Sequence, residues 1–285
     1  MNIPIKTLKN GFSIPAFGIG TSGMGKGGTD EKDVAAIRAA IDRGLTCIDT
    51  AESYADGHAE ELVGEAIQGY DRSELFIISK VWPTHMSHDA LIAACRASLA
   101  RAKTDYFDLY LLHRVPPVPM EEAVGAMNEL ADMGLIKHIG ISNFGVETSA
   151  HAVRASKHPI VYNQVHYNLS FREPEKKGLL AYCQENDMFL AAWKPVDRGA
   201  LLVNPPEIVT RLCDKYSKTP AQIAINWLLS QKNVLTLSKM SHTEHIEENL
   251  GAVGWEMEAS DIERLRTEYP LQHDESDTAP LDAKN

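Results

Sequence analysis

Four residues whose side chains can transfer or guide a proton lie at the ends of apolar runs in the first half of the chain. The run LTCID ends at Asp49, LFIISK ends at Lys80 and LYLLH ends at His113, while Tyr54 follows Asp49 by five residues. An aspartate can hold a lysine ammonium in place, and that ammonium lowers the pKa of a nearby tyrosine from about 10. Tyr54 can then pass a proton near neutral pH while His113 orients a carbonyl oxygen.

Each of these residues also has an ordinary structural explanation. Asp49 can cap a turn, Lys80 can extend its stem to solvent, and His113 can be a core histidine. Tyr54 alone is most often a packing residue. Lys80 can also form a Schiff base as in an aldolase, but only when neutral, and Asp49 favours its charged form. Together the four residues favour acid–base chemistry.

The elements that must position these residues are short strands alternating with helices. Eight apolar runs of about four to seven residues are typical of buried parallel strands; they are PAFGIGT, LTCIDTA, LFIISKVW, FDLYLLH, KHIGISN, IVYNQ, FLAAWKP and VLTLSK. The segments between them have helical periodicity, most clearly at 30–44, 87–103, 119–134 and 219–231. This alternation predicts a (β/α)8 TIM barrel, with a doubly wound sheet as the alternative.

In such a barrel the site lies where the strands end. The residues at the eight predicted strand ends are mostly polar: Gly20, Asp49, Lys80, His113, Asn143, Gln164, Lys194 and Lys239. The chain of 285 residues shows no linker, so we expect one domain over residues 1–285. Asn10-Gly11 predicts a type I′ hairpin that caps the barrel floor. The polar residues from about 271 to 285 predict a loosely held tail.

The stretch AFGIGTSGMGKGG, residues 16–28, resembles two phosphate-binding motifs without meeting the requirements of either. Gly18, Gly20 and Gly23 match a dinucleotide fingerprint, but Gly23 stands six residues before the next helix signal. The P-loop pattern fails at Gly27, where Ser or Thr is needed for Mg²⁺. We therefore expect a strand exit followed by a flexible pocket rim, with Met24 touching substrate.

The composition excludes several classes of partner. A net charge of −11 argues against nucleic acid and anionic membranes, which need clustered Lys and Arg. No signal-like or membrane-spanning run is visible. The four cysteines form no CxxC pair, which predicts a reducing cytoplasm without structural zinc. His85 and His88 are closely spaced, but no third ligand stands at metal-site spacing, so no metal is expected.

Over nearly its whole length the sequence resembles the aldo-keto reductase superfamily. IDTAESY, ISKVW, DLYLLH, IGISNF, NQVHYN and LSKMSHTEHIEENL occur in the order and spacing of that family. The resemblance implies an NAD(P)H-dependent carbonyl reductase on a barrel without a Rossmann fold. It implies that Tyr54 is the general acid, and that Asp49, Lys80 and His113 complete a catalytic tetrad.

The same resemblance implies a cofactor site. Ser142, Asn143 and Gln164 match residues that bind the nicotinamide carboxamide, and Trp193 matches the aromatic residue that stacks on the ring. The remaining implied cofactor contacts are Gly20, Thr21, Asp49, Lys194, Pro195, Val196, Lys239, Met240, His245, Glu248 and Asn249.

Two departures from the family pattern bear on the choice of coenzyme. Met240 stands where Ser is common, and His245 stands where Arg is common. A 2′-phosphate prefers the permanently charged guanidinium fork, whereas histidine is largely neutral above about pH 6.5. We therefore expect NADPH with relaxed selectivity, so that NADH also serves.

The implied substrate is a small carbonyl compound, in a pocket lined by Met24, Tyr54, Trp82, His85 and His113. The short chain beyond Tyr269 predicts an open pocket, and the resemblance favours a monomer. Two alternatives remain: a nucleotide-binding regulatory protein of the same fold with weak catalysis, and the Schiff-base aldolase.

Overall fold

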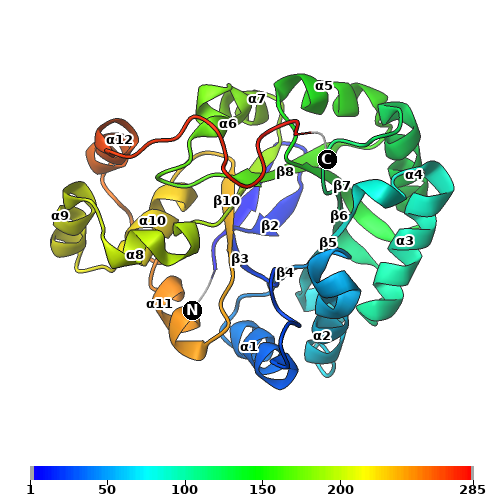
Figure 1. Ribbon diagram of the computed structural model, residues 1–285, viewed down its shortest axis with the longest axis horizontal. Coiled ribbons are helices and arrows are strands. Elements are labelled where there is room, and N and C mark those ends of the chain that lie inside the picture. Colours follow the sequence, from blue (N-terminus) through cyan, green and yellow to red (C-terminus); the bar gives the residue numbers. More distant parts are fainter. Residues whose placement is uncertain (1–2, 284–285) are drawn as a thin grey trace.

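The computed structural model describes residues 3–283, and its centre is a closed barrel of eight parallel strands (Figure 1). Around the barrel the strands follow the order β10-β3-β4-β5-β6-β7-β8-β9. Their bounds are β3 (Phe17–Gly20), β4 (Cys47–Asp49), β5 (Phe76–Val81), β6 (Phe107–Leu112), β7 (Ile136–Ser142), β8 (Ile160–His166), β9 (Phe189–Trp193) and β10 (Val234–Ser238). All eight predicted runs contain a barrel strand, so the TIM barrel is confirmed over the doubly wound sheet.

Helices surround the barrel on all sides (Figure 1). They are α1 (Asp30–Asp42), α2 (His58–Ala66), α3 (His88–Arg101), α4 (Met120–Asp132), α5 (Val146–Ala155), α6 (Glu173–Lys176), α7 (Leu179–Glu185), α8 (Ala200–Val203), α9 (Glu207–Tyr216), α10 (Pro220–Leu229), α11 (Thr243–Leu250) and α12 (Ala259–Glu268). Local chemistry sets their ends: α10 begins with a capping box between Thr219 and Gln222. No helix among residues 3–283 is long and apolar enough to cross a membrane.

The apolar core has two parts, one inside the barrel and one between strands and helices. The inner part includes Ile78, Leu109 and Leu111, all fully buried. Close packing explains Gly140 on β7, because a Cβ there would lie 2.3 Å from Leu111 Cδ2. The barrel interior is therefore filled with side chains, and the site can only lie beyond the strand ends.

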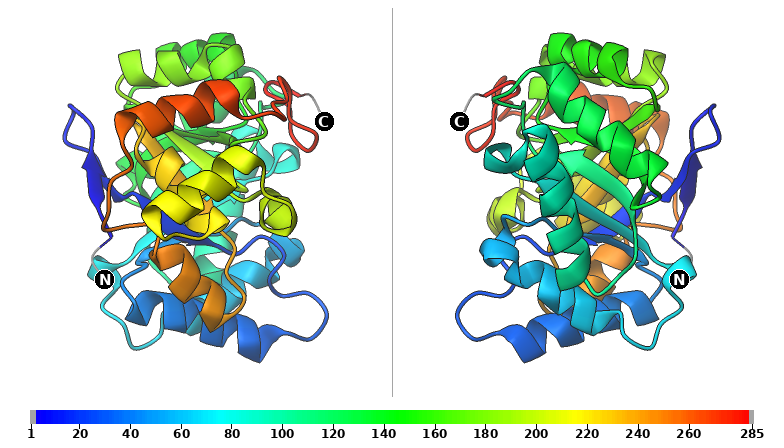
Figure 2. Two further views of the ribbon diagram at one scale, coloured as in Figure 1. Left: turned by 90° about the vertical axis from the view of Figure 1, so that its left-hand side faces the viewer. Right: turned by 90° about the vertical axis from the view of Figure 1, so that its right-hand side faces the viewer.

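An antiparallel hairpin of β1 (Ile5–Thr7) and β2 (Ser13–Pro15) closes one end of the barrel (Figure 2). Leu8 and Phe12, in the turn, pack into the inner core cluster. The predicted hairpin is correct, but its turn is longer than the predicted two-residue type I′. Thr7 pairs with Ser13, which leaves residues 8–12 as the connection.

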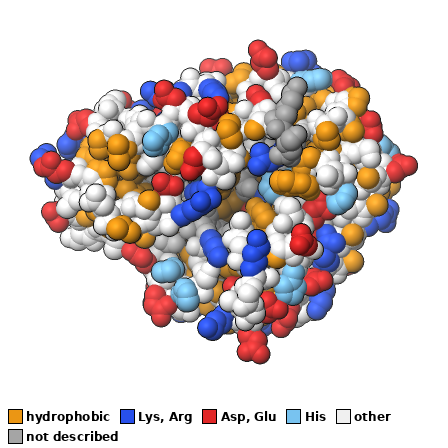
Figure 3. Space-filling model, viewed as in Figure 1, with side chains coloured by type: hydrophobic (Ala, Val, Ile, Leu, Met, Phe, Trp, Pro, Cys, Tyr) orange, Lys and Arg blue, Asp and Glu red, His pale blue; other side chains and the backbone are white. Residues whose placement is uncertain are grey.

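The C-terminal segment, residues 271–283, lies at the opposite end of the barrel from the hairpin (Figure 2). It lies against the face that Figure 1 shows. It is firmly held, contrary to the expected loose tail. The buried carboxylate of Glu173 accepts hydrogen bonds from the backbone N–H of Ser276 (2.9 Å) and of Leu281 (3.0 Å). Asp282 accepts one from the backbone N–H of Gly145 (2.8 Å). Figure 3 shows this face hollowed at its centre, with Lys and Arg side chains around the hollow.

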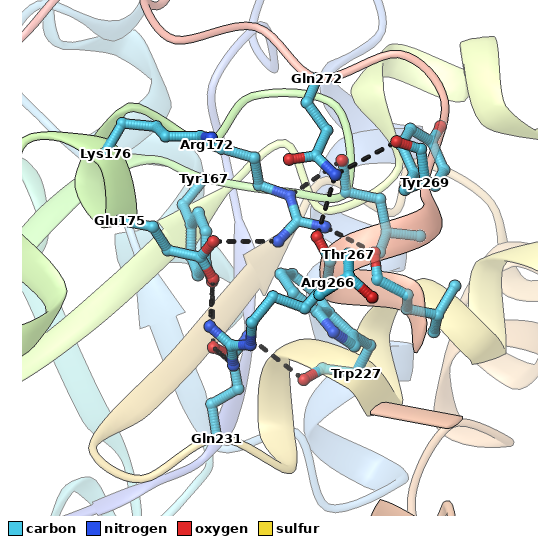
Figure 4. A network of polar contacts seen from close by, with 12 residues as sticks. Tyr167, Arg172, Glu175, Lys176, Trp227, Gln231, Arg266, Thr267, Tyr269 and Gln272 are labelled. Carbon is cyan, nitrogen blue, oxygen red and sulfur yellow. Dashed lines mark hydrogen bonds and ion pairs between the residues drawn. The ribbon is translucent and has the colours of Figure 1, made fainter. Parts of the chain in front are cut away.

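A buried polar network joins α12 to the barrel (Figure 4). Arg172 is fully buried and donates hydrogen bonds to the carbonyl oxygens of Leu169 (2.9 Å) and Leu265 (2.9 Å). Its guanidinium also pairs with Glu175 (3.1 Å) and lies 4.3 Å from the ring centre of Trp227. The C-terminal segment follows α12, so this network fixes the position from which the segment starts across the barrel.

Replacing Arg172 with Met should destabilise the fold by about 3 kcal/mol. The substitution leaves two buried carbonyl oxygens without donors and breaks a buried ion pair. Urea unfolding followed by circular dichroism measures the loss. The matched control is Arg264→Met on α12, a partly exposed arginine whose ion pair with Glu268 should contribute less than about 1 kcal/mol. Equal losses in the two variants would contradict this role for the network.

Candidate active site

Asp49, Tyr54 and Lys80 meet at the strand ends opposite the hairpin. Asp49 ends β4, Lys80 lies on the neighbouring strand β5, and Tyr54 opens a short 3-10 turn (Tyr54–Gly57). The ammonium of Lys80 donates to Asp49 Oδ1 (2.6 Å), to the carbonyl oxygen of Thr50 (2.8 Å) and to Tyr54 Oη (3.1 Å). Lys80 is fully buried, so its three donors are used within the protein.

Burial and charge act in opposite directions on these two groups. Burial alone lowers the pKa of Lys80, but Asp49 and Tyr54 raise it, and the net pKa lies above the usual 10.5. Burial raises the pKa of Tyr54, and the nearby Lys80 charge offsets only part of this. The predicted lowering of the Tyr54 pKa is therefore wrong, because burial outweighs the Lys80 charge. Tyr54 is a protonated phenol at neutral pH.

His113 follows β6 beside Tyr54, with the two ring centres 5.8 Å apart. Burial, and then the Lys80 charge, lowers the pKa of His113 well below 6.5, so its imidazole is neutral at pH 7. Its ring meets Trp82 edge to face at 5.0 Å. A neutral imidazole can donate one hydrogen bond to a carbonyl oxygen without titrating near pH 7.

A cavity of about 1300 Å³ opens over these groups. The predicted site residues that line it are Gly20, Asp49, Tyr54, Trp82, His85, His113, Ser142, Asn143, Gln164, Trp193, Lys194, Pro195, Val196, Lys239, His245, Glu248 and Asn249. Lys80 lies behind this wall, where it contacts Tyr54. The strand ends therefore bring most of the predicted residues to one cavity.

Besides Lys80, three predicted site residues do not line the cavity. Met24, predicted to touch substrate, is fully buried in the core between strands and helices, and so is Met240. Thr21 is also fully buried, and its hydroxyl donates to the carbonyl oxygen of Asp49 (3.0 Å). Residues 23–28 lie outside the lining as well, although the Lys239 ammonium reaches the carbonyl oxygen of Gly23 (3.3 Å).

The amide side chains form one wall of the cavity. Asn143 has φ of 63°, a left-handed conformation that asparagine tolerates better than most residues. Its Nδ2 donates to the carbonyl oxygen of His113 (3.1 Å), while its buried Oδ1 has no partner in the protein. Gln164 Nε2 donates to Asp49 Oδ2 (2.9 Å). A buried acceptor without a donor is costly, so Asn143 Oδ1 indicates a place for a ligand N–H.

Trp193 ends a row of stacked aromatic rings. His166 stacks on it at 4.3 Å and 8°, and Phe171 stacks on His166 at 4.2 Å and 27°. His166 Nδ1 is within hydrogen-bond distance of Ser276 Oγ (2.8 Å) in the C-terminal segment. Thr278 and Ala279 of this segment also line the cavity, so the pocket is more closed than the sequence predicted.

Several cavity residues were missed by the sequence reasoning. The arginines among them are Arg101, Arg114 and Arg198; Glu52, Ser53, Ser238, Ser241 and His242 also belong to the lining. Arg114 stands directly after His113, so its position in the sequence could have signalled it. Arg198 lies in a short 3-10 turn (Asp197–Gly199) that carries no sequence motif, at φ of 53°.

The structure also bears on the aldolase and metal alternatives. A Schiff base requires a neutral amine, and the raised pKa of Lys80 keeps this buried amine charged. Among residues 3–283, no three His, Cys, Asp or Glu side chains are grouped in a way that could hold a metal ion.

Comparisons with known proteins agree with this geometry. The model of the aldo/keto reductase family matches residues 16–269. The chain belongs to this family. It is similar to methylglyoxal reductase YeaE of Escherichia coli (36% identical, covering 90% of this chain and 92% of that protein) and to glyoxal reductase of Bacillus subtilis (33%, covering 90% of each). An aldo/keto reductase of Klebsiella pneumoniae, solved with NADP and acetate, is 35% identical with a TM-score of 0.84, covering 92% of this chain and 94% of that one.

His166 should make the stability of this family member fall in mild acid. Burial, and then the Lys194 charge, lowers the pKa of His166 to about 3, against about 6.5 in the unfolded chain. The unfolded chain therefore binds this proton more readily, so the contribution is complete above pH 6.5 and is lost as pH falls toward 3. Between pH 7 and 5 we expect a loss of about 2 kcal/mol from this group.

Urea unfolding at pH 7 and pH 5 measures this loss. His166→Phe keeps a ring in the stack and should show a smaller drop in unfolding free energy between the two pH values. The control His151→Gln, at a half-exposed position on α5, should behave like the wild type. If the unfolding free energy of His166→Phe falls as much as that of the wild type between pH 7 and pH 5, a group other than His166 takes up the proton.

Proposed function

We propose that this protein is an NADPH-dependent carbonyl reductase that reduces small aldehydes or ketones, with Tyr54 as the general acid. The observation that carries the proposal is the contact of Tyr54 Oη with the buried ammonium of Lys80 at 3.1 Å, at the base of the cavity. The relatives support the reaction class, since two are named as reductases of methylglyoxal and glyoxal.

The cavity fits a nicotinamide coenzyme. Asn143 Oδ1 is a buried acceptor without a donor, and a carboxamide NH₂ would supply one. Trp193 is stacked on His166 and also lines the cavity, so its ring can support a planar group. The cationic side chains of Arg198 and Lys239 line the same cavity and would meet the coenzyme phosphates. A related structure contains NADP.

Lys194, one of the expected coenzyme contacts, also contacts the C-terminal segment. Its ammonium donates to Thr278 Oγ1 (2.7 Å) and lies 4.8 Å from the ring centre of Trp193. It therefore ties the C-terminal segment over the site and adds positive charge near the phosphates.

The chain's own residues would supply orientation and the proton. A nicotinamide coenzyme, when bound, would supply the hydride that adds to the carbonyl carbon. His113, neutral at pH 7, donates a hydrogen bond to the carbonyl oxygen, and Tyr54 transfers its phenolic proton to that oxygen. Lys80 stabilises the tyrosinate that remains, and Asp49 balances the lysine charge. The reverse oxidation would use Tyr54 as the base.

Tyr54→Phe should lower kcat for reduction of methylglyoxal by about a hundredfold or more, because general acid catalysis contributes about 10²–10⁴-fold. The measurement is loss of NADPH absorbance at saturating coenzyme, with the NADPH Kd measured separately by quenching of tryptophan fluorescence. The Kd should stay near wild type, since the phenol oxygen is not a proposed coenzyme contact.

A control variant at Tyr70, a tyrosine outside the cavity lining, separates this effect from general loss of a phenol. Tyr70→Phe removes only a surface hydrogen bond to Asp42 and should keep full activity. Equal turnover by wild type and Tyr54→Phe would refute the assignment of the acid. Tight NADPH binding without turnover of any carbonyl would favour the regulatory nucleotide-binding protein.

We propose relaxed coenzyme selectivity because the phosphate end of the cavity lacks a guanidinium at His245. The ratio of kcat/KM for NADPH and NADH should be modest in the wild type. His245→Arg should raise it about tenfold or more by adding a charge-assisted bidentate contact, and Lys239→Met should lower it. A strong wild-type preference for NADH would contradict this assignment.

A further inference from the structure

Arg114 is a cation of the cavity whose partner is not found in the protein. It follows His113 directly and lines the cavity on the side of Trp82, 5.7 Å from the ring centre of that residue. Its Nε is buried and has no hydrogen-bond partner. Among residues 3–283, no Asp or Glu forms an ion pair with it.

The cavity-lining carboxylates at and after the end of β4 are either engaged or exposed. Glu52 accepts from the backbone N–H of Trp82 (2.5 Å) and pairs with His85 (3.1 Å). Asp49 is shared by Lys80 and Gln164. Asp56 also lines the cavity, but it is exposed at the mouth. None of these groups neutralises Arg114, and burial without a counter-charge lowers its pKa.

A partly buried guanidinium without an ion pair favours a ligand that supplies negative charge. The ring of Trp82 offers only a cation–π contact, at a distance near the limit of about 6 Å. A guanidinium has five N–H donors in a planar fork that matches a carboxylate with two parallel hydrogen bonds. Arg114 therefore has the chemistry to hold a carboxylate that arrives with a ligand.

The coenzyme is not the source of that carboxylate. The cations proposed to meet coenzyme phosphates are Arg198, in the loop after β9, and Lys239, after β10. Arg114 lies after β6 and shares its wall with His113 and Trp82, where the reacting carbonyl would lie. The barrel order separates β6 from β9 and β10. This wall therefore faces the position that the proposed function gives to the substrate.

We propose that Arg114 binds a carboxylate carried by the substrate, so that the preferred substrates are oxo acids whose aldehyde or ketone group is reduced. The inference rests on the proposed function and adds the substrate class. The carbonyl end meets Tyr54 and His113, and the carboxylate end meets Arg114. The reaction that supplies such a substrate must produce an aldehyde or ketone on an acid, and the product is a hydroxy acid.

The test compares 4-oxobutanoate with butanal, which has the same chain length but no charge. With NADPH, wild-type kcat/KM should be at least tenfold higher for the oxo acid. Arg114→Gln should lower kcat/KM for 4-oxobutanoate by about ten- to a hundredfold, mainly through KM, and leave butanal within about twofold. Arg114→Lys keeps the charge but not the fork and should fall between.

The matched control is Arg96→Gln, which removes one positive charge from the exposed face of α3. It should leave both substrates unchanged, because its charge lies outside the cavity lining. Equal kcat/KM for the two substrates in the wild type would overturn the proposal. An equal loss for both in Arg114→Gln would also overturn it, since that result indicates packing against Trp82 instead.

A binding measurement separates this proposal from the proposed reductase activity. Calorimetry with succinate needs no turnover, and Arg114→Gln should weaken succinate binding at least tenfold while Arg96→Gln does not. Succinate binding through Arg114 in a protein that reduces neither aldehyde would refute the reductase and keep the anion site. Succinate affinity that is the same in all variants would refute the anion site, whatever the enzyme turns over.

Discussion

The buried ion pair between Lys80 and Asp49 constrains the rest of the site. A fully buried ammonium is tolerated only when each of its donors has a partner, because removing a charge from water costs several kcal/mol. Asp49, Thr50 and Tyr54 supply those partners at 2.6, 2.8 and 3.1 Å. Two neighbouring strands must therefore end in register, which the rigid parallel barrel ensures. The pair fixes the phenol of Tyr54 beside a permanent positive charge.

The same carboxylate connects proton transfer to the amide wall. Asp49 Oδ1 faces Lys80, while Oδ2 accepts from Gln164 on β8, across the barrel from β4. Next to Gln164 in the sheet, Asn143 reaches back to the carbonyl oxygen of His113. One connected set of hydrogen bonds thus joins the groups proposed to hold the carboxamide to those proposed to act on the carbonyl. Movement of either part would disturb the other.

Sequence patterns predicted the barrel and most of the residues that line its cavity for a physical reason. Parallel strands buried on both faces are nearly continuous apolar runs, so polar residues such as Asp49 or Asn143 stand out where the runs stop. Loops lack this periodicity. Met24 and Met240 lie beside site residues in sequence, yet their side chains turn into the core. Sequence spacing in a loop does not determine which side a residue faces.

Two other differences arise from interactions that no sequence pattern records. The C-terminal segment is polar, but it is held through backbone N–H groups donating to the buried carboxylate of Glu173, and every residue except proline has that donor. The sequence identified Lys80 as the charge near Tyr54 but not how deeply the phenol is buried. Burial is the larger effect on the Tyr54 pKa, so its direction depended on the fold.

The charge of the side chains around the cavity is opposite in sign to the net charge of the whole chain. The whole chain has a net charge of −11, yet Lys and Arg side chains gather around the central hollow (Figure 3). A cleft with low-dielectric walls concentrates the field of the charges that line it. An anionic coenzyme and an anionic substrate would thus meet a locally positive surface on an acidic protein. The acidity of the rest of the protein would disfavour anion binding away from this site.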